Sequence, residues 1–143
     1  MRLARFAPVA IILAAALSGA GCSLFSTTNK NAPLIPVAHS PIADVPIPAG
    51  FEMTAASSSK EVNSLRFVDH HYQGNDDLQP VVQFYREEMP KYKWEKKQQT
   101  QPNGNEVSIE FTKGSEVCVV TVTAHTFSTE VHVRIDPAGR NGG

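Results

Sequence analysis

The sequence predicts an α+β fold of two layers, in which one helix packs on an antiparallel β-meander sheet and a β-hairpin precedes both. Three observations predict it. Residues 76–89 carry apolar side chains at helical spacing. Three later segments, residues 106–113, 117–125 and 130–135, alternate apolar and polar side chains with a period of two. Short turn sequences separate these segments, so chain neighbours are expected to pair as antiparallel strands.

The first 22 residues have the pattern of a secretory leader. Arg2 and Arg5 supply positive charge, residues 6–17 are uncharged and mostly apolar, and small residues lead to Cys22. This order is typical of a signal peptide that is removed. The apolar run is shorter than the ~20 residues that a membrane-spanning helix needs, so a retained span is not expected.

The end of the leader resembles the lipobox of bacterial lipoproteins, in which an acylated cysteine becomes the mature N-terminus. Residues 20–22 match the lipobox, whereas Gly19 stands where that family usually has an aliphatic residue. The resemblance implies that residues 1–21 are a lipoprotein signal peptide and that Cys22 is lipidated. The alternative is ordinary cleavage after Ala20, which would release a soluble secreted protein.

This leader is expected to place the protein in the cell envelope, facing the periplasm. Ser23 follows the cysteine, where an Asp commonly holds Gram-negative lipoproteins at the inner membrane, and so the outer membrane is favoured. The chain has 13 Lys and Arg against 14 Asp and Glu and no basic run, so nucleic acid is not an expected partner. The expected partners are the membrane, through the lipid anchor, and an envelope protein or polymer.

Composition divides the rest of the chain into three parts. Residues 22–50 carry five of the ten prolines without apolar periodicity, and are expected to be the lipidated cysteine and an extended Pro-rich linker. Residues 51–137 are expected to form the globular domain. Residues 138–143 are expected to be a disordered tail.

The domain is expected to open with a hairpin and a helix. A weak strand at residues 51–60 and a stronger one at residues 63–72 form the hairpin. The helix over residues 76–89 has Asp77 as its N-cap, and Pro90 ends it. A single apolar stripe predicts that this helix packs on a sheet; the stripe consists of Leu78, Val81, Val82, Tyr85 and Met89.

A four-stranded meander is expected to follow the helix. A lysine-rich edge strand begins at Trp94, and an Asn-Gly turn joins it to the strand at residues 106–113. Two further hairpins complete the meander. The expected registers place Ile109 opposite Cys118 and Val122 opposite Val133, and both bury the same face of the central strand.

The two cysteines do not predict a disulfide framework. Cys118 lies in the apolar run of residues 116–122, which predicts a small buried thiol rather than a catalytic nucleophile. The domain is therefore expected to depend on its hydrophobic core for stability.

Motifs spread over residues 46–136 resemble a family of small, uncharacterised bacterial lipoproteins. That family usually has Gly where this chain has Lys93. The resemblance implies a lipid-anchored envelope domain and carries over no catalytic residue. The matching residues are Pro46-x-Pro48-x-Gly50-Phe51, Tyr72-x-Gly74, Val82-x-Phe84-Tyr85, Met89-Pro90, Trp94, Phe111-x-Lys113 and Cys118.

The arrangement of the histidines favours a protein that is not an enzyme. His70 and His71 are neighbours on one strand and point to opposite faces. His125, Glu130 and His132 share the solvent face of the last hairpin, but exposed polar residues give the same pattern. We therefore expect a non-catalytic interaction or structural module without a cofactor or metal. The alternatives are an envelope enzyme or metal-binding protein using the His125/Glu130/His132 surface, and small-ligand carriage between helix and sheet.

Overall fold

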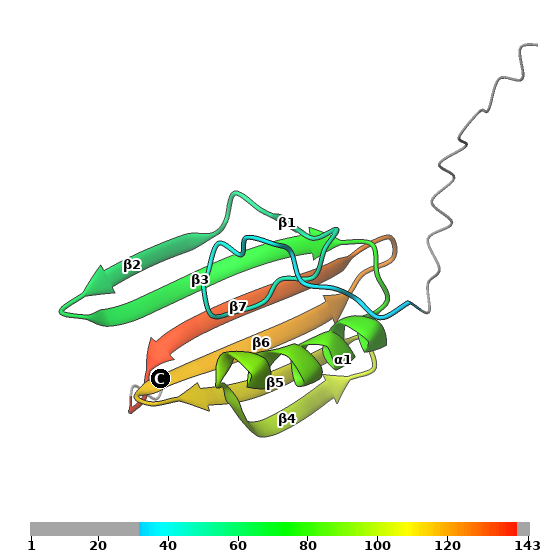
Figure 1. The fold of residues 1–143 in the computed structure, drawn as a ribbon. Helices are drawn as coiled ribbons and strands as arrows, with labels where there is room; N and C mark the ends of the chain where they lie inside the picture. Colours follow the sequence, from blue (N-terminus) through cyan, green and yellow to red (C-terminus); the bar gives the residue numbers. More distant parts are fainter. Residues whose placement is uncertain (1–31, 140–143) are drawn as a thin grey trace, which may run out of the picture.

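The structure, a computed structural model, describes residues 32–139 (Figure 1). The expected signal peptide, the lipidation site Cys22 and residues 140–143 of the expected tail lie outside the described residues. Within residues 32–139, no helix combines the length and the apolar character that crossing a membrane requires. The elements are β1 (Glu52–Met53), β2 (Ser58–Val62), β3 (Leu65–Gly74), α1 (Leu78–Glu88), the 3-10 helix η1 (Met89–Tyr92), β4 (Glu95–Asn103), β5 (Glu106–Lys113), β6 (Glu116–Ala124) and β7 (Thr129–Pro137).

All the strands belong to one antiparallel sheet. Its order is β1-β3-β7-β6-β5-β4, and β2 also pairs with β3. The expected fold class, with a hairpin standing before a separate four-stranded meander, is therefore wrong. The molecule is mostly a seven-stranded sheet with one short α-helix, because β3 pairs with β7 over seven residues, from Val68↔Ile135 to Gly74↔Thr129. This long-range pairing joins the hairpin to the meander.

The registers of the last two hairpins also differ from those expected. Ile109 lies opposite Val120 rather than Cys118, and Val122 lies opposite Val131 rather than Val133. Both registers are shifted by two residues. A strand repeats its side-chain direction every two residues, so this shift leaves the predicted apolar face intact.

The helix forms where the sequence predicts it. Asp77 is the N-cap residue, and the predicted stripe faces the core with Val81, Val82 and Tyr85 almost fully buried. After α1 the chain tightens into η1 around Pro90 and leaves it at Lys93 with φ +69°. Glycine is the residue that adopts this left-handed conformation most readily at the end of a helix.

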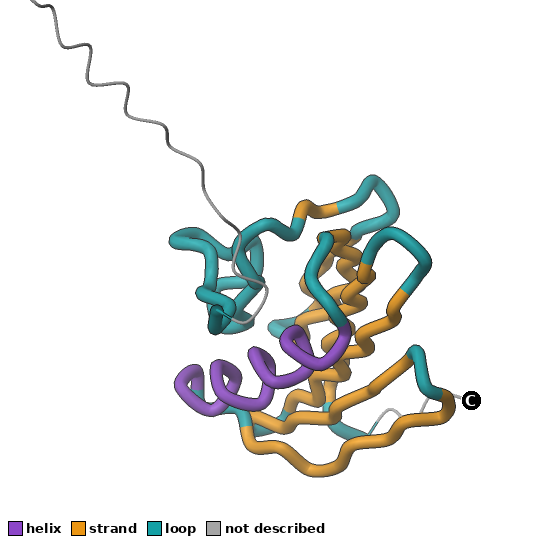
Figure 2. Tube along the Cα trace, turned by 90° about the vertical axis from the view of Figure 1, so that its right-hand side faces the viewer, coloured by secondary structure: helices purple, strands orange, loops and turns teal. Residues whose placement is uncertain are grey.

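The stretch expected to be a linker is partly folded. Ile42, Val45 and Ile47 are at most 4% exposed and belong to the hydrophobic core. The Val37 amide donates to the carbonyl of Ile47 at 2.9 Å, which folds the stretch back on itself. Proline excludes regular helix and central strand but not burial. A lack of apolar periodicity in a proline-rich stretch therefore does not indicate an exposed linker. Figure 2 shows this segment and α1 together on one side of the sheet.

An ion-pair cluster holds this segment to the sheet. The Asp44 carboxylate accepts from Arg66 on β3 at 2.7 Å and from Lys113 on β5 at 2.7 Å. Arg66 also donates to Glu116 on β6 at 2.6 Å. Burial raises the pKa of Asp44, but its hydrogen bonds with Arg66 and Lys113 lower it more, so the carboxyl stays ionised. The indole nitrogen of Trp94 donates to the Asp44 carbonyl at 2.7 Å.

The core lies between the sheet and the layer formed by α1 and the N-terminal segment. Cys118 is fully buried, as predicted, and burial raises the pKa of its thiol well above the usual value. The other side of the sheet carries neither the helix nor the segment (Figure 2). We call that side the open face.

Two isoleucines of the N-terminal segment test whether it is part of the folded domain. Ile47 is 1% exposed and Ile35 is 67% exposed. We expect Ile47→Ala to lower the free energy of unfolding by about 2–5 kcal/mol, because it leaves a cavity in the core. Ile35→Ala should change it by less than about 0.5 kcal/mol. Urea unfolding followed by Trp94 fluorescence measures both, and equal midpoints would contradict the packing.

Candidate functional site

The open face carries a cluster of imidazole and carboxylate groups on two adjacent strands. β3 contributes Asp69 and His71, which alternate with the core-facing residues of that strand. β7 contributes Glu130 and His132 in the same way. The β3–β7 register places His71 directly opposite His132, so the four side chains meet near the middle of the sheet. We call these four residues the imidazole–carboxylate cluster.

The two imidazoles and Asp69 form its centre. The rings of His71 and His132 are stacked, with centroids 4.1 Å apart and planes inclined by 10°. One carboxylate oxygen of Asp69 lies 2.9 Å from His132 Nε2 and 3.1 Å from His71 Nε2. Their ligand-capable atoms all lie within 4.8 Å of one another, so these three residues could hold a metal ion.

Glu130 supports this centre from the side. Its Oε1 lies 2.8 Å from His71 Nδ1, and its Oε2 lies 3.4 Å from His125 Nε2. The hydrogen bond from His71 and the weaker one from His125 lower the pKa of Glu130 and outweigh the effect of burial, which raises it. Glu130 is therefore an anion at neutral pH and keeps the Nδ1 proton of His71 in place.

The structure brings together part of the site suggested by the sequence. Glu130 and His132 belong to the cluster, whereas His125 is half exposed and contacts only the far oxygen of Glu130. Sequence reasoning missed Asp69 and His71. Their alternation on the strand at residues 63–72 placed them on one face, but nothing local indicated that this strand pairs with the last one.

Comparison with protein families identifies the domain. The START domain-like family model matches residues 50–139. The chain belongs to the START domain-like family. Searches of curated proteins and of solved structures gave no match. The matched residues include every member of the imidazole–carboxylate cluster. The match supports the START domain-like family and gives no support to the expected family of lipoproteins.

On the other side of β3, this START domain-like domain has a buried histidine. His70 is 6% exposed, with Nε2 2.6 Å from the Ser59 hydroxyl and Nδ1 2.9 Å from the Tyr72 hydroxyl. Burial lowers the pKa of His70 and raises that of Tyr72 to about 12, so both are neutral at pH 7. Because each ring nitrogen has a hydroxyl partner, His70 is a satisfied core residue.

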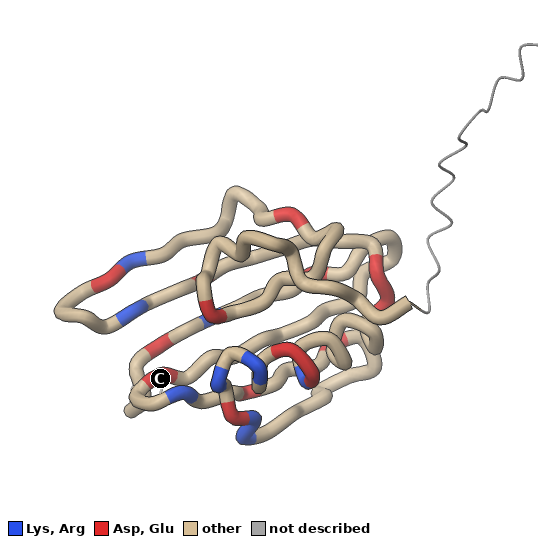
Figure 3. Tube along the Cα trace, in the orientation of Figure 1, with Lys and Arg blue, Asp and Glu red and all other residues tan. Residues whose placement is uncertain are grey.

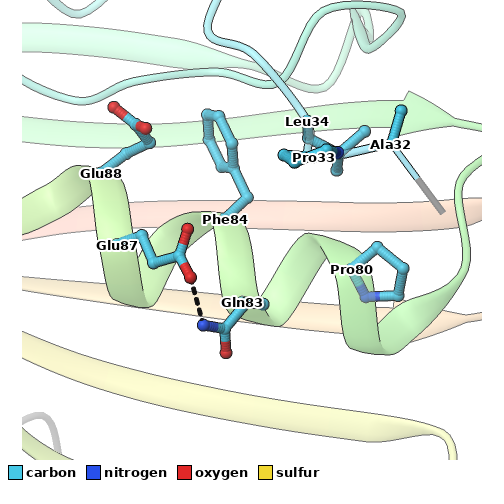
Figure 4. A pocket seen from close by; sticks show the side chains of 8 residues that line it. All are labelled: Ala32, Pro33, Leu34, Pro80, Gln83, Phe84, Glu87 and Glu88. Atoms are coloured by element: carbon cyan, nitrogen blue, oxygen red, sulfur yellow. Dashed lines mark hydrogen bonds between the residues drawn. The ribbon is translucent and has the colours of Figure 1, made fainter.

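A groove of about 330 Å³ separates α1 from the start of the described chain (Figure 4). Its polar side chains are paired with neighbours: Gln83 donates to Glu87, and Glu88 accepts from Lys91 at 2.6 Å. The groove therefore lacks the converging free polar groups that chemistry needs. Its lining consists of Ala32, Pro33, Leu34, Pro80, Gln83, Phe84, Glu87 and Glu88.

A serine pair tests the structural role of His70. Ser59→Ala removes the hydroxyl that contacts Nε2 of His70; because Ser59 is exposed, water can replace it, and we expect a loss of about 0.5–1.5 kcal/mol in unfolding free energy. Ser58→Ala is the control, because Ser58 lies on the same exposed strand but opposite Asp69 rather than beside His70. Urea unfolding measures both variants. Equal stability of the two would show that Ser59 does not satisfy His70.

Proposed function

We propose that this chain is a lipid-anchored, non-catalytic module of the cell envelope that binds an envelope glycan through its open face. The observation that carries the proposal is a row of polar side chains crossing five strands at one level of the sheet. Successive register partners define this row, which we call the polar row: His71, His132, Thr121, Ser108 and Thr100.

The polar row suits an extended, hydroxyl-rich polymer. Neighbouring strands lie ~4.8 Å apart, so the row offers one hydrogen-bonding group at each such step, a spacing close to that of sugar units in an extended glycan. Ser108 and Thr121 already bond to each other at 2.7 Å, which fixes their hydroxyls in place. The imidazoles at one end add flat surfaces on which a sugar ring packs.

The charge around the polar row disfavours a polymer with a dense negative charge. Asp69, Arg134 and Glu110 flank it on one side, and Glu130 and Glu106 lie on the other. Both signs are distributed along the chain rather than gathered in one basic patch (Figure 3). Anionic nucleic acid would meet these carboxylates without a compensating cationic surface.

The non-catalytic part of the proposal rests on where the reactive groups lie. The Cys118 thiol is buried, with a raised pKa, on the core side of the sheet. The histidines of the open face lie on the opposite side, and both ring nitrogens of the core-side His70 are occupied by the hydroxyls of Ser59 and Tyr72. No thiol and imidazole pair is therefore found within residues 32–139.

The anchor part of the proposal rests on the leader pattern ending at Cys22. Because the core begins to include the chain near Leu34, eleven residues separate Cys22 from the folded domain. Such a stretch spans at most ~40–43 Å when fully extended. The domain would therefore stay close to the membrane and meet polymers that lie directly above it.

Glycan binding is tested with purified peptidoglycan sacculi. We expect the protein to sediment with sacculi, and Thr121→Lys to weaken this binding at least tenfold because the long cationic side chain interrupts the polar row. Gln83→Lys, on the exposed side of α1, is the matched control and should bind like the unchanged protein. A protein that stays in the supernatant, or a Thr121→Lys variant that sediments normally, would refute the proposal.

Lipidation is tested by mass spectrometry of the mature protein from bacterial membranes. We expect the N-terminal peptide to begin at an acylated Cys22, and Cys22→Ala to release the protein from the membrane fraction. A mature chain beginning at Gly21 would indicate cleavage after Ala20 and a soluble protein instead.

A further inference from the structure

We propose that Asp69, His71 and His132 bind one divalent transition-metal ion of the zinc class on the open face. The proposal goes beyond glycan binding, because it depends on the imidazole–carboxylate cluster and not on the rest of the polar row. It would stand or fall separately from the sedimentation experiment above.

The spacing of the three ligands is close to that of a metal centre. Two ligands of a tetrahedral zinc ion, each at about 2.0–2.1 Å, lie about 3.3–3.4 Å from each other. The Asp69 oxygen lies 2.9 Å and 3.1 Å from the two Nε2 atoms. Binding of an ion therefore requires the Asp69 oxygen to move away from each Nε2 by only a few tenths of an ångström, together with a turn of the two stacked rings.

His71 is held between two carboxylates. Both of its ring nitrogens face carboxylate oxygens, Nδ1 at 2.8 Å from Glu130 and Nε2 at 3.1 Å from Asp69. An ion between Nε2 and Asp69 is bound by both of these atoms, while Nδ1 keeps its contact with Glu130.

Glu130 is a positioning residue for this ion. Metal-bound histidines usually donate their second N–H to a carboxylate, which fixes the tautomer and raises the basicity of the ligand. The His71–Glu130 contact already has this form. His132 contributes only its Nε2 to the centre, at 2.9 Å from Asp69.

The ligand set selects the class of metal. Two imidazoles and one carboxylate suit zinc, copper or nickel, whereas magnesium and calcium prefer oxygen ligands. The side chains of His71 and His132 are 26% and 33% exposed, so the stacked rings have room to turn until both lone pairs point at one ion. Three protein ligands leave a fourth position open to water.

Zinc titration of the purified mature protein tests the site. Calorimetry at neutral pH should give one zinc ion per chain and no measurable heat with magnesium. We expect His132→Ala to abolish binding and Glu130→Gln to weaken it about 10–100-fold. His125→Ala is the matched control and should bind like the unchanged protein, because His125 contacts only Glu130. Circular dichroism establishes that each variant is folded.

A second readout identifies the donor set. Cobalt(II) bound to the same residues should give the strong visible absorption of a four-coordinate ion, and His132→Ala should lose it. Thr100→Lys, which also interrupts the polar row but lies three strands from His132, should keep zinc binding, so the two proposals fail separately. The proposal would be overturned if the unchanged protein bound no zinc, or if His132→Ala bound zinc as tightly as the unchanged protein. It would also be overturned if His125→Ala lost as much zinc binding as His132→Ala.

Discussion

The pairing of β3 with β7 is the interaction on which the rest of the structure depends. Without it, β2 and β3 would be an isolated two-stranded hairpin, which is marginally stable in water. The pairing extends the meander into one sheet and gives the core the side chains of Val68 and Tyr72. The same ladder places His71 opposite His132, so the fold and the imidazole–carboxylate cluster have one origin.

One short helix cannot cover a sheet of this width, and the N-terminal segment supplies the remaining cover. Val45 and Ile47 fill the space beside α1. Asp44 forms ion pairs with Arg66 in one half of the sheet and with Lys113 in the other. Because these partners lie on β3 and β5, with β7 and β6 between them, the ion pairs hold both halves to the same segment. The Trp94 indole adds a hydrogen bond to the same turn.

Local patterns in the sequence predicted the local structure well. The helix, its stripe and the buried face of β5, β6 and β7 follow from spacing alone, and the two-residue errors in register left that face unchanged. Long-range features were not predictable in this way. No local signal joins residue 71 to residue 132, and a proline-rich stretch has no period that indicates whether Val45 is buried. Half of the cluster was therefore missed.

His70 and His71 show how the side of the sheet determines the role of a residue. On the core side, two hydroxyls satisfy both nitrogens of His70, and nothing remains for a ligand. On the open face, His71 lies between two carboxylates and is partly exposed, so a ligand can reach its ring. Exposed ion pairs contribute only about 0–1 kcal/mol to stability, so the fold gains little from this arrangement. The proposed cation between His71 and Asp69 would give the four side chains a role that stability does not require.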